Sequence, residues 1–228
     1  MYGVFQQLAV NPIIYAAETY ELSEPDTAKQ ENANSGSPDG HTHSHDAWAP
    51  QDGIERILST LGANILVAMG FSLILLSAMA IHNLKSSKPK VKWTSGILWG
   101  VGLMLCFFVS PALLGLHPEV PGTVAENLHN RQIWWISCAV ATALGLILIY
   151  YGSAALKLAG GALVAFPHII GAPVTDNHTY TNSDPAVVAA LNELTSQFLI
   201  MTSVGMLIFF VVLGALSGVA SGRFVRFG

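Results

Sequence analysis

Charged side chains are scarce in this sequence, and they are unevenly distributed. Lys, Arg, Asp and Glu make up 11% of the 228 residues, whereas soluble domains carry roughly 25%. Long stretches contain no charge at all, while residues 18–56 are rich in charge. This pattern is typical of a membrane protein, so the apolar runs are interpreted first as membrane spans.

The short motifs that mark several other classes of protein are also absent. There is no G-x-x-x-x-G-K-[ST] loop, so the chain has no built-in nucleotide-driven motor. It has no H-E-x-x-H, G-x-S-x-G or kinase signature, and no basic-aromatic stretch typical of a nucleic-acid surface. A metal-dependent membrane enzyme would need ligands inside the spans, which hold no acidic residue and only marginal histidines. We therefore expect neither an enzyme nor a protein that binds nucleotide or nucleic acid.

Cysteine is rare as well. Cys106 and Cys138 each lie in an apolar run, and neither belongs to a C-x-x-C motif. We expect small buried side chains at both positions, with a structural disulfide or a metal thiolate as the alternatives.

Six apolar runs predict the transmembrane helices of a single domain, residues 1–228. A span needs roughly 20 apolar residues, because lipid offers the backbone no hydrogen-bond partner. Four runs meet this requirement clearly: Ile57–Ile81, Trp93–Leu116, Ile133–Tyr151 and Phe198–Ala220. The shorter run 152–170 and the run Val4–Ala17 complete the set, the latter as the outer part of a helix that begins at or before Met1.

Charge placement orients these spans. With both termini cytoplasmic, the external segments 18–56, 117–132 and 168–197 contain all 14 acidic residues. Seven of the ten basic residues are internal: Lys85, Lys88, Lys90, Lys92, Lys157, Arg223 and Arg226. The arrangement obeys the positive-inside rule, whereas a five-span chain would move the last two outside. We predict an all-α integral membrane protein with about six transmembrane helices and one long external loop, about residues 19–52.

Glycine spacing predicts where two helices approach closely. Gly96 and Gly100 form a G-x-x-x-G motif, and Gly214, Gly218 and Gly222 repeat the spacing in the last span. Such glycines let helix backbones pack together in a membrane.

The external loop contains the most informative local motif, His41-Thr-His43-Ser-His45-Asp46. In an extended chain, side chains at i, i+2 and i+4 share a face, so the three imidazoles can point at one ion. Imidazole with carboxylate suits Co²⁺, Ni²⁺, Cu²⁺ and Zn²⁺, and the motif does not select among them. The alternative is a flexible polar loop that binds metal only adventitiously.

Further candidate ligands lie at the outer ends of the spans. His168 follows Pro167 near a helix end, where unpaired carbonyls and an ionisable side chain favour a cation site. Glu119 ends the third run on the same face, and Glu18 with Glu21 leaves the first helix there. The alternatives are a hydrogen-bonded helix-end histidine and ordinary solvated carboxylates.

A set of short motifs in a fixed order resembles CbtA, a family of predicted cobalt transporter subunits. After the His-rich loop, the set comprises Trp48-Ala-Pro-Gln-Asp52-Gly-Ile-Glu55-Arg56, Ala63-Asn64, Gly70-Phe71, Pro118-Glu119-Val-Pro121-Gly122, Arg131-Gln132-Ile-Trp134-Trp135 and Pro167-His168-Ile-Ile-Gly171-Ala-Pro173. The resemblance covers essentially the whole chain. It implies a multi-pass protein of the bacterial inner membrane that takes up Co²⁺ for cobalamin synthesis. It also implies a small His-rich single-span companion of the CbtB-like type.

These observations predict a divalent-metal permease or channel-like subunit in a lipid bilayer. The loop histidines capture the ion, and Glu119, His168 and the Glu18/Glu21 pair pass it to an entrance. Cobalt is favoured as the transported ion, and association of the chain into a homo-oligomer is left open. The alternative is a non-transporting metal-binding or assembly subunit of a larger membrane complex.

Overall fold

The computed structural model describes residues 2–21, 50–51, 53–85, 92–174 and 179–224. Within these residues all regular structure is helical, apart from one isolated bridge between Thr123 and Tyr180. The elements are α1 (Tyr2–Phe5), η1 (Gln6–Val10), α2 (Asn11–Glu21), α4 (Ile54–Lys85), α5 (Trp93–Met104), η2 (Leu105–Leu113), α6 (Leu128–Tyr151), α7 (Ala154–Ile170) and α8 (Pro185–Phe224). The predicted all-α fold class is confirmed.

Four helices are long and apolar enough to cross a membrane, judged by length and composition. They are Ile54–Leu84, Trp93–Leu113, Leu128–Tyr151 and Pro185–Arg223, and they contain the four clear apolar runs of the sequence for all but a few terminal residues. The apolar helix α7 is shorter, at 17 residues. Most of the predicted external loop, residues 22–49, lies outside the described part of the chain.

Two segments, η1 and η2, are π-helical turns continuous with their neighbouring α-helices. Pro111 lies inside η2, and Pro12 is the second residue after η1 ends. Proline lacks a backbone N–H and crowds the carbonyl four residues back, so the local turn widens to five-residue hydrogen bonds. Leu116 N accordingly bonds Pro111 O at 2.9 Å.

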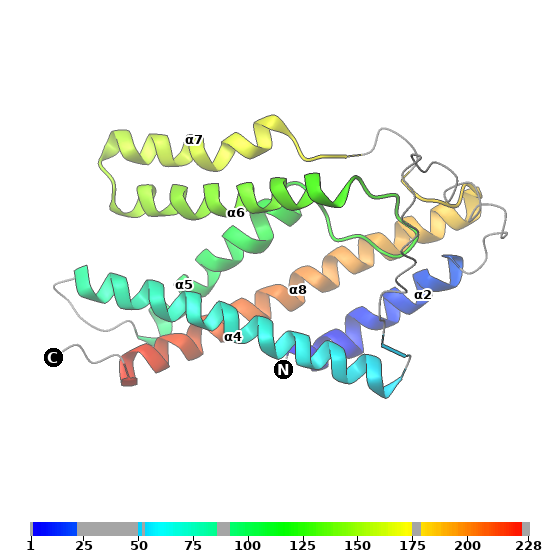
Figure 1. Cartoon of the computed structure of the whole chain (residues 1–228), viewed down its shortest axis with the longest axis horizontal. Coiled ribbons are helices and arrows are strands. Elements are labelled where there is room, and N and C mark those ends of the chain that lie inside the picture. The colour runs from blue at the N-terminus through cyan, green and yellow to red at the C-terminus, as the bar shows by residue number, and fades with distance from the viewer. Residues whose placement is uncertain (1, 22–49, 52, 86–91, 175–178, 225–228) are drawn as a thin grey trace, which may run out of the picture.

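Successive helices run back and forth, so that the end of α2, the starts of α4, α6 and α8 and the end of α7 lie toward one end of the molecule (Figure 1). The loop after η2 meets the segment before α8, where Val124 N donates to Thr179 O at 3.0 Å. Ala17 of α2, Val120, Tyr180 and Leu191 of α8 form a small buried cluster at the same end. The described parts of the loops after η2 and before α8 therefore pack with the end of α2 into one layer, which we call the outer layer.

The backbones of α5 and α8 approach each other closely at glycine residues. A Cβ atom added at Gly96 or Gly100 would collide with the backbone oxygen of Gly214 or Phe210, respectively. Alongside this contact, Leu75, Met79, Leu103, Met104, Phe108, Ala112, Phe210 and Leu213 form the main apolar core. The predicted glycine-mediated approach of two helices is confirmed.

A second pair, α6 and α7, forms a hairpin joined by Gly152 and Ser153. At Gly160 an added Cβ would lie 2.7 Å from the carbonyl oxygen of Gly145. The α7 helix ends at Ile170 because Gly171 adopts a φ of 91°, a conformation that favours glycine. This hairpin packs against η2 and brings the end of α7 to the outer layer.

Candidate functional site

His168 takes part in a polar cluster formed by three helices. Its Nε2 atom lies 3.0 Å from Ser110 Oγ of η2, and Thr142 Oγ1 of α6 donates to the same oxygen at 2.8 Å. Ser110 and Thr142 are 4% and 3% exposed, so the hydroxyl pair is shielded by protein. A buried polar cluster between apolar helices is costly unless its members bond one another, and these do.

Trp134 closes one side of this cluster. Its indole N–H donates to Pro167 O at 3.3 Å, and its ring stands nearly perpendicular to the imidazole of His168, with the centroids 6.0 Å apart. Gly115 leaves room for the indole, since a Cβ atom there would overlap it. The indole fixes the end of α7 against α6 and thereby sets the position of His168.

The second ring nitrogen of His168, Nδ1, is buried and has no hydrogen-bond partner in the protein. Buried polar atoms are nearly always paired, so such an atom calls for an explanation. A neutral imidazole nitrogen with a free lone pair is a good ligand for borderline transition-metal ions. The chemistry of this atom therefore fits a metal ion.

The local sequence accounts for much of this geometry. Trp134, Cys138 and Thr142 recur every four residues on the buried face of α6. Cys106 precedes Ser110 by one turn, and both cysteines are buried and free, as expected for small packing side chains. The hydroxyls of Ser110 and Thr142 were not singled out from the sequence. The available signals were the Ser110-Pro111 step and a threonine within an apolar helix.

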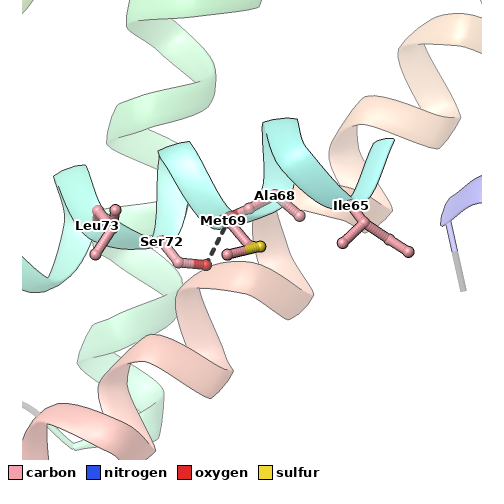
Figure 2. A pocket seen from close by; sticks show the side chains of 5 residues that line it. All are labelled: Ile65, Ala68, Met69, Ser72 and Leu73. Carbon is pink, nitrogen blue, oxygen red and sulfur yellow. Dashed lines mark hydrogen bonds between the residues drawn. The ribbon is translucent and has the colours of Figure 1, made fainter. Parts of the chain in front are cut away.

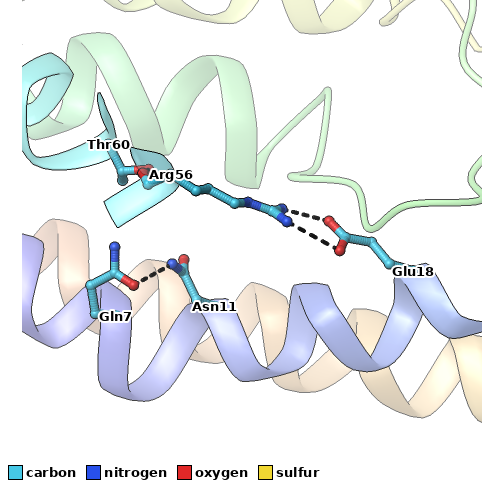
Figure 3. Close-up of polar contacts among 5 residues, drawn as sticks. All are labelled: Gln7, Asn11, Glu18, Arg56 and Thr60. Atoms are coloured by element: carbon cyan, nitrogen blue, oxygen red, sulfur yellow. Dashed lines mark hydrogen bonds and ion pairs between the residues drawn. The ribbon is translucent and has the colours of Figure 1, made fainter. Parts of the chain in front are cut away.

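Glu119 and Glu18 each form an ion pair with an arginine at the outer layer. Arg131 Nη2 lies 2.6 Å from Glu119 Oε2, and Arg56 Nη2 lies 2.5 Å from Glu18 Oε1. Figure 3 shows the second pair, in which Arg56 reaches from α4 to α2. The Arg56 guanidinium also stacks over Tyr15 at 4.7 Å from the ring centroid. Each arginine neutralises its carboxylate and competes with a metal ion for it.

The other predicted ligands are not placed by the structure. His41, His43, His45 and Asp46 lie outside the described residues, and so does the side chain of Glu21. Among the residues that are described, no three His, Cys, Asp or Glu side chains are grouped to hold a metal ion. His168 contacts the hydroxyl of Ser110 and the indole of Trp134, while Glu119 and Glu18 pair with arginines.

Polar side chains also connect the N-terminal helix to α4 below the Glu18–Arg56 pair. Asn64 Nδ2 donates to Gln6 Oε1 at 2.6 Å, and Asn11 Nδ2 donates to Gln7 Oε1 at 2.7 Å. Gln7 and Asn11 lie on the same side of the N-terminal helix as Glu18 (Figure 3). The Asn64–Gln6 bond joins two helices, as side-chain amides do in membranes, whereas the Asn11–Gln7 bond lies within the N-terminal helix.

The opposite end of the molecule has a cluster of its own. His82 Nδ1 lies 2.7 Å from Tyr151 Oη, and its ring packs edge-on against Trp99 at 5.5 Å. This histidine lies at the C-terminal end of α4, whereas the outer layer lies at the other end of that helix. It cannot join His168 in one site.

The α4 helix is the least covered of the long helices. Only 11% of its most apolar 18-residue stretch is buried. A shallow apolar depression of about 370 Å³ lies on it, lined by Ile65, Ala68, Met69, Ser72 and Leu73 (Figure 2). Its lining carries no charged side chain, so this surface suits lipid or another apolar helix and not an ion.

The whole chain was compared with protein families, curated proteins and solved structures. The family model described as "Probable cobalt transporter subunit (CbtA)" matches residues 1–221, nearly the entire chain. No curated protein and no solved structure matches the chain.

Proposed function

Because this chain belongs to the CbtA family of probable cobalt transporter subunits, we propose that it is the subunit through which Co²⁺ crosses the membrane. In this proposal α7 and the N-terminal helix join the four long apolar helices to make six spans. Both termini then lie in the cytoplasm of a bacterium, and the outer layer faces the external side of its inner membrane. The metal would serve cobalamin synthesis.

One observation carries the proposal beyond the family: the buried, unpartnered Nδ1 atom of His168 at a junction of three helices. An ion that has left bulk water gains more from each ligand, because protein and lipid screen charge weakly. Imidazole nitrogen also matches the preference of Co²⁺ better than the neutral oxygens elsewhere in the described helices. His168 is thus the proposed ligand on the path.

The remaining candidate ligands act before His168. The imidazoles of His41, His43 and His45, with Asp46, capture the ion in the external loop. Glu18, Glu21 and Glu119 attract it to the outer layer, where Arg56 and Arg131 must release the two described carboxylates before these can bind. Inward movement of two positive charges through 100 mV releases about 4.6 kcal/mol, so the membrane potential can drive uptake.

A second function is favoured by the exposed apolar face of α4. A helix with so little cover inside its own chain can pack against a partner, such as a single-span CbtB-like companion or a second copy. In that case the chain is a metal-binding or assembly subunit, and another subunit conducts the ion.

Metal flux into proteoliposomes separates the two functions. The purified chain alone, and the chain with its companion, are reconstituted and given external Co²⁺ under an inside-negative potential. We expect vesicles that contain this chain alone to take up more Co²⁺ than empty vesicles do. Uptake by the companion alone, unchanged when this chain is added, would contradict the proposal and favour assembly.

Cysteine labelling tests the six-span topology. We expect an impermeant maleimide to label Ser37→Cys from the external side of intact cells, and to label Ser87→Cys only after the cells are opened. The native Cys106 and Cys138 are buried, so the maleimide should label them neither in intact nor in opened cells. If both introduced cysteines were labelled from the same side, the chain could not cross the membrane once between them, and the six-span topology would be wrong.

Removal of the loop imidazoles tests capture. Replacement of His41, His43 and His45 together by Ala should reduce uptake several-fold at low external cobalt, where capture limits the flux. Saturating cobalt should restore the rate, because capture is then no longer limiting. A matched triple replacement of the neighbouring Ser35, Ser37 and Ser44 by Ala serves as control. If the histidine variant matches wild type at every concentration, the loop has no capture role.

A further inference from the structure

We infer that Ser110 and Thr142 are positioning residues, which hold His168 with its proton on Nε2 and leave Nδ1 as the metal-binding atom. The inference deepens the proposed function and rests on it. It identifies two hydroxyl side chains, on two other helices, as part of the metal site. It also specifies which ring nitrogen meets the ion.

Counting donors and acceptors distinguishes the two neutral forms of the imidazole. Ser110 Oγ already accepts the proton of Thr142, and a hydroxyl oxygen can accept one more and donate one. With the proton on Nε2, the ring donates to Ser110 and leaves only a lone pair at Nδ1. With the proton on Nδ1, a buried N–H would have no acceptor. Orphaned buried N–H groups are rarer than under-used acceptors, so the structure favours the first form.

The hydroxyl proton of Ser110 also needs an acceptor in the first form. Serine in a helix can donate to a carbonyl one turn back. Pro111, the next residue, contributes no N–H to the helix, so one carbonyl of the preceding turn lacks its usual donor. The serine–proline step in η2 thus supplies the oxygen that accepts from His168 and leaves one carbonyl of the preceding turn without its usual backbone donor.

This arrangement matches what metal-binding histidines require. Such a histidine nearly always donates its other ring N–H to an oxygen, which fixes the ring orientation and makes the ligating nitrogen more basic. A histidine that only packed a helix end would be expected to have both nitrogens paired. Trp134 prevents the ring from turning away, since the indole stands against it and is itself bound to Pro167 O. The Nδ1 lone pair is therefore held ready for a borderline divalent cation such as Co²⁺.

Nitrogen NMR of the metal-free protein tests the tautomer directly. Full-length chain labelled with ¹⁵N-histidine is prepared in nanodiscs, and His168 is assigned from the signals lost in His168→Gln. We expect Nε2 to carry the proton and Nδ1 to show the shift of an unprotonated ring nitrogen. A proton on Nδ1 would overturn the inference, whatever the protein transports.

Cobalt titration of the same samples tests the positioning role. Paramagnetic loss of the assigned His168 signal reports a cobalt ion close to this side chain, and it is followed separately from the signals of the other seven histidines. Ser110→Ala and Thr142→Val should raise the cobalt concentration needed by roughly 10–100-fold, as found for groups that orient metal-bound histidines. Thr202→Val is the matched control, because its buried hydroxyl has no partner, and it should leave the titration unchanged.

The outcomes separate this inference from the proposed function. An Nε2 proton with weakened cobalt binding in both variants supports the inference even if proteoliposomes show no flux. Wild-type cobalt titrations in Ser110→Ala and Thr142→Val overturn it even if flux is observed. Should Ser110→Ala fail to fold, the tautomer of the wild-type protein and the Thr142→Val titration still decide the question.

Discussion

The α5–α8 contact and the junction of η2, α6 and α7 are packed by the same means but differ in polarity. In both, a glycine lies against a backbone oxygen, at Gly100 in the first and at Gly160 in the second. The first continues into the apolar core of Leu103 and Phe210. The second continues outward into the hydroxyl and imidazole side chains around His168. Glycine brings the two helices close in each case, so the hydroxyls of Ser110 and Thr142 are not what brings α6 and α7 together.

That difference suggests how to separate structural residues from functional ones. A polar group among apolar helices lowers stability unless it is paired, and in membrane proteins such groups mark pathways for ions or protons. Changes in the α5–α8 contact should therefore affect folding first. Changes in the junction should affect metal binding more than folding.

The largest expected effect is on folding, from Gly100→Leu. The new side chain would collide with the backbone of Phe210, which cannot move without separating α5 from α8. We expect a loss of about 3 kcal/mol or more in unfolding free energy, the upper end for overpacking.

Gly102→Leu is the matched control, because nothing lies within 4 Å of an added Cβ there. Its stability should equal that of wild type or exceed it by up to about 1 kcal/mol, because leucine favours the helix more than glycine does. Denaturant titration in detergent measures both variants. Equal stability of the two would show that the α5–α8 contact is not the main packing interface.

A smaller effect is expected from Gly160→Ala in the α6–α7 hairpin. A methyl group 2.7 Å from Gly145 O would force the two helix backbones apart, at a cost of about 1–2 kcal/mol. The neighbouring Gly161→Ala, with open space around it, should gain up to about 1 kcal/mol from helix propensity.

The two alanine variants also sharpen the comparison of the two regions. Because α7 carries His168, its displacement in Gly160→Ala should weaken cobalt binding, while Gly161→Ala binds as wild type. Thermal unfolding first confirms that both variants are folded. Cobalt titration then measures their binding. Unchanged binding in Gly160→Ala would mean that the hairpin contact does not set the position of His168.

Much of the fold was predictable because hydrophobic length and charge placement are local properties of the sequence. The start of α5 at Trp93 and the end of α7 before Gly171 follow directly from such signals. The last helix contains the predicted apolar run Phe198–Ala220 and extends beyond it, since it begins at Pro185. Asp184 Oδ1 accepts from Ala186 N at 2.8 Å and caps the helix, and the polar residues that follow do not interrupt it.

The site was predictable only in part. The sequence predicted His168 as a candidate ligand, because a helix-breaking proline precedes this ionisable side chain near the membrane boundary. Its partner Ser110 lies 58 residues away, and their contact depends on how η2 and α7 are rotated about their axes. The pairing of Glu18 with Arg56 depends on the docking of α2 on α4 in the same way. Sequence periodicity predicts which face a residue occupies but not which helix that face meets.

The maximal rate of cobalt uptake in His168→Ala tests the central claim most directly. His82→Ala is the matched control, because it removes a hydrogen-bonded histidine at the other end of the helices. At saturating cobalt in proteoliposomes, we expect His168→Ala to lose at least about tenfold in rate, and His82→Ala to stay near wild type. Excess metal should not restore the first variant, since the lost ligand lies on the path and not in the capture loop. Wild-type rates in a well-folded His168→Ala would contradict the account and leave His168 a packing side chain.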